Sequence, residues 1–265
     1  MTKIEWTDVT WNPVRGCSLT SPGCLNCYAM EMAHRFSGSG KAYENLTERS
    51  RSGKTRWSGQ VRLVPELLDL PLRWRKPRMV FVNSMSDLFH ETVPLEFIRA
   101  VFDTMKRANW HVFQILTKRS ARLLELHEQL EWPANVWMGV SVESARYIHR
   151  ADHLRETGAR MKFLSVEPLL GPVSALSVEG LQWVIAGGES GPHARPMELD
   201  WVREVRDKCL DAGVAFFLKQ LGGRRDKRGG AQALLDGRTW TEYPTAVENA
   251  LAPDPEPYPN RERSE

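Results

Sequence analysis

The chain has 265 residues, of which 42% are hydrophobic and 26% are charged, and its formal net charge is +3. This length allows one large domain, such as an α/β barrel of roughly 200–250 residues, and no apolar run approaches the roughly 20 residues that span a bilayer. The modest charge does not by itself indicate nucleic acid, and the first residues lack the apolar core of a secretion signal, so we expect a cytoplasmic protein with no membrane partner.

Three of the four cysteines lie in one loop near the start of the chain. The stretch RGCSLTSPGCLNCYAM (15–30) contains Cys17, Cys24 and Cys27. In a reducing compartment clustered cysteines indicate metal ligands or redox groups rather than disulfides. Structural zinc usually requires four ligands, and His34 is a nearby candidate for the fourth. The interpretation that we favour is an iron–sulfur cluster held by three thiolates, with one iron left open for a small molecule.

Two basic stretches contain glycine and do not fit regular elements. They are LTERSRSGKTRW (46–57) and GGRRDKRGG (222–230). Clustered Lys and Arg beside a flexible backbone suit contact with the phosphates of a nucleic acid. Solvated surface loops are the alternative interpretation of the same composition.

Apolar runs alternate with helical segments between residues 78 and 223. Each apolar run is followed at once by polar residues, and the runs are 78–89, 110–119, 135–144, 161–170, 181–191 and 214–223. The segments between them fit helices over 94–108, 120–130, 145–158 and 199–213. Near-continuous apolar strands that alternate with helices predict a parallel sheet buried on both faces. With a further strand before residue 16, this predicts an α/β fold of the partial or full (β/α) barrel type, with outer helices; a doubly wound open sheet is the alternative.

Every predicted strand ends in polar side chains. Ligands of parallel α/β folds bind at the carboxyl ends of the strands, so we expect these side chains to line one pocket. A helix cap or a salt bridge in a loop is the alternative for any one of them. The residues are Asn83, Ser84, Ser86, Asp87, Thr117, Lys118, Arg119, Ser141, Glu143, Ser165, Glu167, Glu189, Ser190, Lys219 and Gln220.

The end of the chain differs in composition from the rest. Residues 245–265 are rich in Pro, Glu and Asn and poor in apolar residues, which predicts a disordered tail. No repeat or low-complexity linker divides residues 1–244. We therefore expect a single domain over 1–244, followed by the tail.

The cysteine loop resembles the cluster loop of the radical S-adenosylmethionine (SAM) enzymes, whose usual pattern is Cys-x3-Cys-x2-Cys. Here the first gap is six residues, and Tyr28 follows the third cysteine. The chain resembles more closely an uncharacterised, phage-annotated family of bacterial and phage proteins with this longer motif. IEWTDVTWNPVRGC, SPGCLNCYA, FVNSMSDLFH, WVIAGGESGP and FFLKQLGG are similar to motifs of that family, and the similarity covers roughly residues 3–243.

The radical SAM resemblance implies a fold and a chemistry. It implies a radical SAM type barrel, a [4Fe-4S] cluster on Cys17, Cys24 and Cys27, and SAM bound to the open iron. An electron from a flavodoxin or ferredoxin type donor would then cleave SAM to a 5′-deoxyadenosyl radical. The basic stretches favour a nucleic-acid base as the substrate. A non-catalytic module that binds zinc and recognises nucleic acid or a protein is the alternative from another functional class.

The resemblance also implies roles for the strand ends. Related enzymes bind the SAM amino group through Gly-Gly-Glu after the second strand, where this chain has Asn83, Ser84, Ser86 and Asp87 instead. The literal Gly187, Gly188 and Glu189 come later, where they would shape the adenosine pocket. Ser141 and Glu143 would hold the ribose, and Lys118 and Lys219 would bind the SAM carboxylate or an anionic substrate, with Glu167 beside them on the rim.

Overall fold

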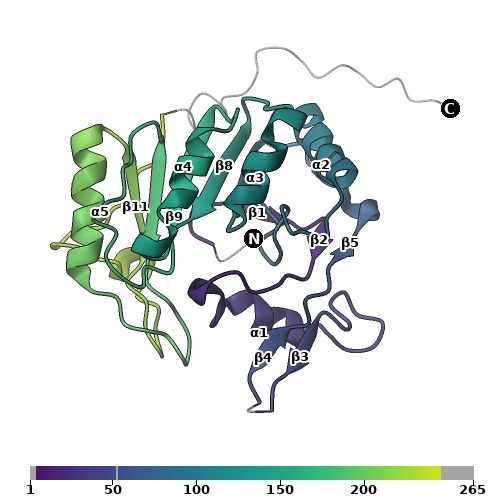
Figure 1. Ribbon diagram of the computed structural model, residues 1–265, viewed down its shortest axis with the longest axis horizontal. Helices are drawn as coiled ribbons and strands as arrows, with labels where there is room; N and C mark the ends of the chain where they lie inside the picture. Colours follow the sequence, from purple (N-terminus) through teal and green to yellow (C-terminus); the bar gives the residue numbers. More distant parts are fainter. Residues whose placement is uncertain (1–3, 52, 246–265) are drawn as a thin grey trace.

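The computed structural model describes residues 4–51 and 53–245 and consists mainly of one curved parallel sheet (Figure 1). Seven strands follow one another in chain order, so that each is paired with the next in parallel. They are β1 (Val9–Trp11), β6 (Met79–Val82), β7 (Val112–Thr117), β8 (Val136–Ser141), β9 (Met161–Val166), β10 (Trp183–Gly187) and β11 (Ala215–Gln220).

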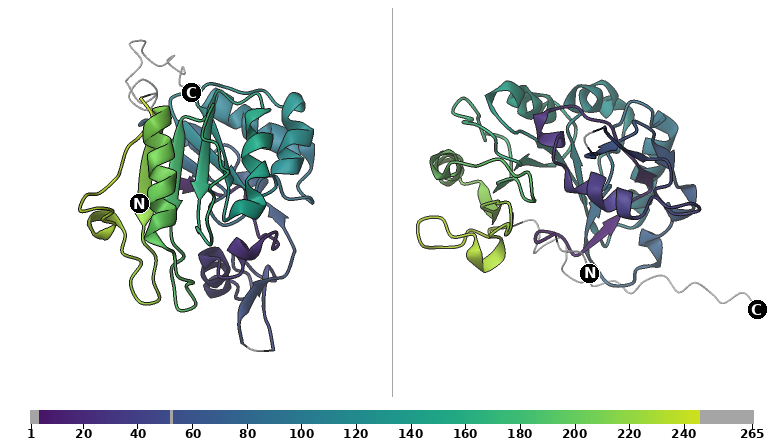
Figure 2. Two further views of the ribbon diagram at one scale, coloured as in Figure 1. Left: turned by 60° about the vertical axis from the view of Figure 1, so that its left-hand side comes forward. Right: turned by 90° about the horizontal axis from the view of Figure 1, so that it is seen from below.

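Helices cover the convex face of this sheet (Figure 2). They are α2 (Leu95–Arg107), α3 (Ser120–Leu126), α4 (His149–Arg155) and α5 (Leu199–Ala212). Their apolar sides and the outward side chains of the strands form one continuous buried cluster, which includes Cys209 of α5. Among the described residues, no helix has the length and apolar character needed to cross a membrane.

The concave face carries a second, largely aromatic cluster. Because side chains alternate along a strand, Val136 and Met138 of β8 join the helical face, whereas Trp137 points to the other side. Phe163 and Trp183 pack beside Trp137, and the cluster includes Trp6 from the amino-terminal segment. This face is therefore filled at its amino-terminal end, and open space lies toward the carboxyl ends of the strands.

A smaller segment between β1 and β6 lies against the carboxyl ends of the strands. It contains β2 (Val14–Arg15), α1 (Tyr28–Arg35), β3 (Thr47–Arg49), β4 (Thr55–Trp57) and β5 (Arg62–Leu63). Strands β3 and β4 form an antiparallel hairpin, so the expectation that 46–57 holds no regular element is wrong. Trp57 of β4 packs with Met30 and Ala33 of α1 in a separate buried cluster. Short 3-10 turns are found at Pro22–Cys24, Pro65–Leu67, Pro71–Arg73, His127–Gln129, Ala145–Tyr147 and Gly230–Gln232.

The structure confirms the predicted α/β class, the parallel strands and the outer helices. Strands β1 and β11 are the two edges of an open sheet in the described part of the chain, so the sheet is a half-barrel. The partial-barrel form of the prediction is confirmed, and the full-barrel form is wrong. The doubly wound alternative is also wrong, because the strand order contains no reversal. The predicted tail over 245–265 lies outside the described residues, except for its first residue.

Buried His111 gives the fold a pH dependence that can be measured. Its Nε2 lies 3.1 Å from the carbonyl oxygen of Pro71, and burial lowers its pKa below the ordinary value. A histidine with a lowered pKa in the folded state takes up a proton more readily when unfolded. Stability is therefore lost as the pH falls below about 6.5, the ordinary histidine pKa.

We expect His111→Gln, which keeps an N–H donor for Pro71, to remove part of this loss. Urea unfolding at a series of pH values between neutral and mildly acidic checks it. The wild type should lose more unfolding free energy than the variant as the pH falls. Parallel curves for the two proteins would contradict the prediction.

Candidate functional site

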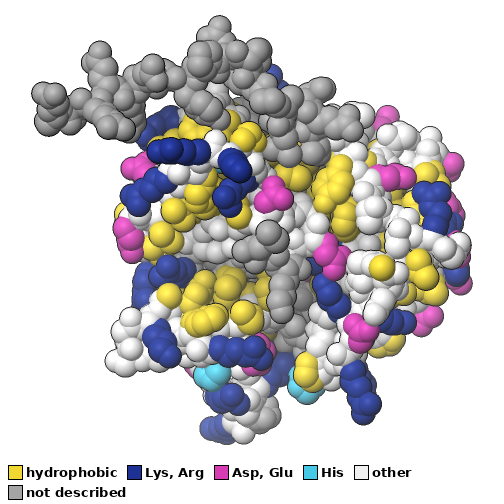
Figure 3. Space-filling model, turned by 180° about the vertical axis from the view of Figure 1, so that it is seen from behind, with side chains coloured by type: hydrophobic (Ala, Val, Ile, Leu, Met, Phe, Trp, Pro, Cys, Tyr) yellow, Lys and Arg dark blue, Asp and Glu magenta, His cyan; other side chains and the backbone are white. Residues whose placement is uncertain are grey.

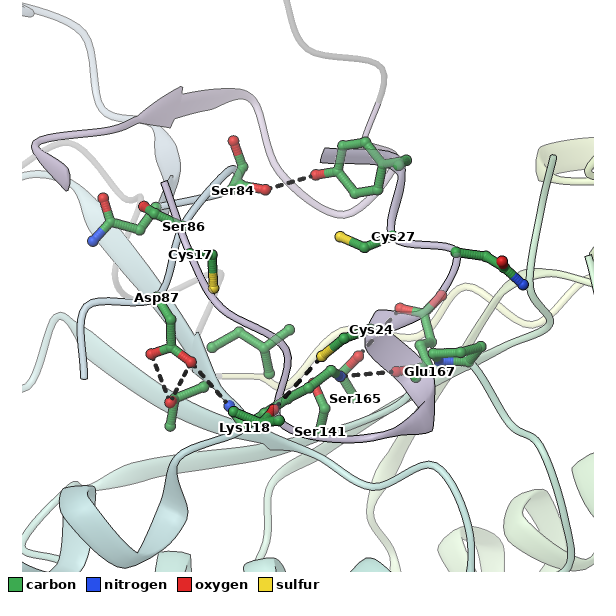
Figure 4. A pocket seen from close by; sticks show the side chains of 18 of the residues that line it. Cys17, Cys24, Cys27, Ser84, Ser86, Asp87, Lys118, Ser141, Ser165 and Glu167 are labelled. Atoms are coloured by element: carbon green, nitrogen blue, oxygen red, sulfur yellow. Dashed lines mark hydrogen bonds between the residues drawn. The ribbon is translucent and has the colours of Figure 1, made fainter. Parts of the chain in front are cut away.

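A cavity of about 240 Å³ lies between the carboxyl ends of the strands and the cysteine loop. All three loop cysteines line it, and their side chains lie at separate points around one hollow (Figure 4). All the polar residues predicted from the strand ends except Glu143 line it too, namely Asn83, Ser84, Ser86, Asp87, Thr117, Lys118, Arg119, Ser141, Ser165, Glu167, Glu189, Ser190, Lys219 and Gln220, and Gly188 lines it with them. Glu143 and Gly187 are not among the lining residues.

The cysteine loop is shaped by a 3-10 turn and a helix start. Pro22 and Gly23 open the turn that ends at Cys24, and Cys27 is the residue that precedes α1. Gly23 lies so close to Glu143 that a Cβ in its place would be 2.5 Å from Oε1 of that carboxylate. The absence of a side chain at this position therefore lets the loop approach β8.

The three thiols have different environments. Burial raises the pKa of Cys17 to about 12, although the Arg119 guanidinium, with Nη1 3.8 Å from Sγ, opposes this. Burial also raises the pKa of Cys27. Hydrogen bonds from backbone N–H groups in the first turn of α1 act in the opposite direction but are outweighed. Burial would raise the pKa of Cys24 as well, but the charge of Lys118 and hydrogen bonds from Thr20 and Ser21 outweigh it and lower that pKa. Cys24 is thus the thiol of the three that ionises most readily.

Glu143 anchors the loop to β8. Its Oε1 accepts a 2.5 Å hydrogen bond from the Ser21 hydroxyl and lies 3.2 Å from the Lys118 ammonium. Its Oε2 accepts from Nη1 of the buried Arg150 at 3.0 Å. Both oxygens of this fully buried carboxylate are engaged by the protein, and the cationic partners lower its pKa in spite of burial. The structure therefore gives Glu143 an anchoring position behind the loop rather than a place on the cavity wall.

Glu189 anchors the same loop from the other side. Its Oε2 accepts a 2.9 Å hydrogen bond from the side-chain amide of Asn26, which lies between the second and third cysteines. Arg195 pairs with the same carboxylate, with Nη2 2.6 Å from Oε1, and its Nη2 also donates to the Pro22 carbonyl oxygen at 2.9 Å. The turn between Pro22 and Asn26 is thus held to the loop that follows β10.

Arg119 forms the third attachment. Its Nη1 donates to Asp87 at 2.9 Å, and its Nη2 donates to the Ser18 hydroxyl at 2.7 Å. Asp87 also accepts from the Thr117 hydroxyl at 2.7 Å, which fixes the carboxylate at the end of β7. The residue after Cys17 is therefore tied to the ends of β6 and β7.

The remaining polar groups face the cavity. Lys219 forms an ion pair with Glu167 at 3.2 Å, and the Ser165 hydroxyl donates to the same carboxylate at 3.3 Å. Asn83 has a left-handed backbone with φ of 60°, and its Oδ1 accepts from the Val14 amide. Its Nδ2 is buried and has no hydrogen-bond partner among the described residues. An unpaired buried donor on a cavity wall is costly unless a ligand accepts from it.

Sequence analysis missed the residues that hold the loop. Ser21, Asn26, Arg150 and Arg195 each contact a carboxylate at a strand end. Asn26 could have been noticed because it lies inside the cysteine motif. The partner of Ser21 is 122 positions away in the chain, and no local pattern links two such residues.

Comparisons with known proteins identify relatives but no activity. A family model described as "Protein of unknown function (DUF5131)" matches residues 1–244. Searches of curated proteins and of solved structures each returned no match.

Proposed function

The chain belongs to the protein family of unknown function DUF5131, and we propose that it is an iron–sulfur enzyme of the radical SAM type. One observation carries the proposal: three cysteines from a single loop line one cavity at the carboxyl ends of a parallel half-barrel. Parallel α/β folds bind their ligands at that end. In the reducing compartment expected from the sequence, clustered cysteines stay as thiols and are more often metal ligands than disulfides.

The donor set consists of three thiols, and thiolates are the ligands that iron–sulfur clusters take. The three thiols line one cavity, and no group of three or more His, Cys, Asp or Glu in the described part of the chain is close enough to hold one metal ion. Cys17, Cys24 and Cys27 would hold the cluster, and Arg119 and Lys118 would offset its negative charge.

The cavity also offers groups for SAM. When bound, the cluster and SAM supply reductive cleavage of the sulfonium and hence abstraction of a hydrogen atom from a substrate. The free amide hydrogens of Asn83 suit a carboxylate or carbonyl oxygen. Lys118 and Lys219 also line the cavity, each paired with a carboxylate, and Trp6, Phe81 and Leu116 make part of its lining apolar.

Anaerobically purified protein tests the proposal directly. We expect it to be brown, to contain about four irons with matching sulfide as a [4Fe-4S] cluster does, and to release 5′-deoxyadenosine from SAM when reduced with dithionite. Colourless protein with bound zinc that is inert toward SAM would contradict it and would favour the non-catalytic zinc module. A flavodoxin or ferredoxin should replace dithionite as electron donor.

A further inference from the structure

Two basic segments have a net positive charge, in contrast to the rest of the chain. One is the β3–β4 hairpin with its flanking residues (46–57), the other is the loop after β11 (222–230), and we refer to them as the basic arms. Each contains four Lys or Arg and a single carboxylate, so each has a net charge of +3. Since the whole chain has a net charge of +3, the rest of it carries a net charge of −3.

Two arginines on each arm are left without a carboxylate partner among the described residues. Arg49 and Arg51 on the first arm, and Arg224 and Arg225 on the second, are exposed and form no ion pair with any residue that the structure describes. Some exposed cations elsewhere do have carboxylate partners. Examples are Lys106 and Arg107 of α2, which pair with Glu131 at 2.5 Å and with Asp103 at 3.5 Å.

The arms lie on the two sides of the cavity. On the first, Lys54 donates to Asn26 at 2.7 Å, and Trp57 lines the cavity. The second begins two residues after Gln220, which also lines it. Both arms project beyond the carboxyl ends of the strands (Figure 2). Figure 3 shows Lys and Arg side chains on two projections along this edge of the molecule.

Apolar side chains lie at the surface between the arms. Tyr28, with half of its surface exposed, lines the cavity, and Leu25 beside it is also exposed. Trp57, from the hairpin that carries the first set of cations, also lines the cavity, although most of its ring is buried against α1. Cations that track a phosphate backbone, with aromatic rings between them on which bases stack, are the pattern of proteins that bind single-stranded nucleic acid.

We propose that the basic arms bind the phosphodiester backbone of a single-stranded nucleic acid and that this places one base in the cavity. The inference rests on the proposed function, because the nucleic acid would be the substrate of the enzyme proposed above. A single strand is favoured because a base in a duplex must first leave the stack to enter a pocket. A strand is long enough to touch both arms while a base enters the cavity between them.

Fluorescence anisotropy with labelled strands of about 20 nucleotides, longer than the ~4–16 bound per single-strand-binding fold, tests the inference. The probes are single-stranded DNA, single-stranded RNA and duplex DNA, and no SAM is added. Four phosphate contacts predict a salt slope of about −2.8 on single strands, or about 50-fold weaker binding at 200 mM than at 50 mM salt. Whichever single strand binds more tightly, RNA or DNA, is identified as the preferred kind of nucleic acid. The duplex should bind more weakly than either single strand.

Paired variants assign the binding to the arms. Arg49→Gln with Arg51→Gln, and separately Arg224→Gln with Arg225→Gln, should each reduce the slope by about 1.4 and weaken binding at 50 mM salt by about tenfold or more. The control is Lys106→Gln with Arg107→Gln, which removes the same charge from α2 and should bind like the wild type. Thermal unfolding confirms that all four proteins are folded.

The inference and the proposed function fail in different ways. Wild-type protein that binds no strand at low salt, or arm variants that bind like the α2 control, would overturn the inference whatever the iron content. Arm variants that bind strands normally, but lose turnover driven by flavodoxin and keep turnover with dithionite, would assign the arms to an electron donor and also overturn it. Protein that lacks iron and still binds strands through the arms would refute only the radical SAM proposal.

Discussion

Replacing any one of Cys17, Cys24 and Cys27 with alanine is expected to remove most of the bound iron and to lower 5′-deoxyadenosine formation by about 100-fold or more. Even groups that only support a metal ligand contribute about 10–100-fold to metal affinity or activity, so the loss of a ligand should exceed that. The three thiols line one cavity. Each substitution therefore leaves a cluster with two protein ligands at most.

Cys209→Ala is the matched control for this experiment. Cys209 is buried in α5 within the convex-face cluster and does not line the cavity. Its variant should keep iron and turnover, with a small loss of unfolding free energy from the smaller side chain. Bound iron and SAM turnover are measured for all four variants, and unfolding curves confirm that each is folded. These measurements show whether the loop cysteines are the cluster ligands. Loop variants that retain the iron and turnover of the wild type would refute the assignment of the ligands.

Glu143→Gln is expected to destabilise the protein by about 3–5 kcal/mol, the usual cost of breaking a buried ion pair by removing one partner. The substitution leaves the buried guanidinium of Arg150 and the Lys118 ammonium without their carboxylate. Typical unfolding free energies are about 5–15 kcal/mol, so the loss is a large share of the total. The hydrogen bond from the Ser21 hydroxyl to residue 143 should weaken as well, so the cysteine loop should be held less firmly and the amount of bound iron should fall.

Urea unfolding with Glu131→Gln as control measures this effect. Glu131 pairs with Lys106 at the surface, and exposed pairs contribute only about 0–1 kcal/mol. The experiment also separates anchoring from the ribose binding expected of Glu143. Weaker SAM binding with an unchanged unfolding midpoint would favour the ribose role and contradict the anchoring role.

Fold class could be predicted because the apolar pattern is local. The runs that become β6 to β11 are buried on both faces, and such strands are apolar along nearly their whole length. The polar residues after them could be placed at one end of the sheet because parallel strands all end on the same side. Whether the sheet closes depends on the pairing of its first and last strands, which are about 200 residues apart, and the sequence pattern does not encode that pairing.

Roles within the site could not be predicted in the same way. Glu143 follows β8 by two residues and Glu167 follows β9 by one, so the two are much alike in the sequence. Only Glu167 lines the cavity, because the loop carrying Ser21 and Gly23 covers Glu143. The anchoring roles of Asn26 and Arg195 likewise arise from contacts across more than 160 positions of the chain.

By itself, the sequence determined which segments form the strands and outer helices of the large sheet, that the polar strand ends meet on one side, and that three thiols lie in one loop. These properties follow from side-chain alternation and short spacings. The tertiary structure decided that the sheet is an open half-barrel, which carboxylates hold the loop and which face the cavity, and that the two basic arms lie on opposite sides of it. The physical reason is that these arrangements depend on packing between residues far apart in the chain, which determines which polar groups are left facing open space.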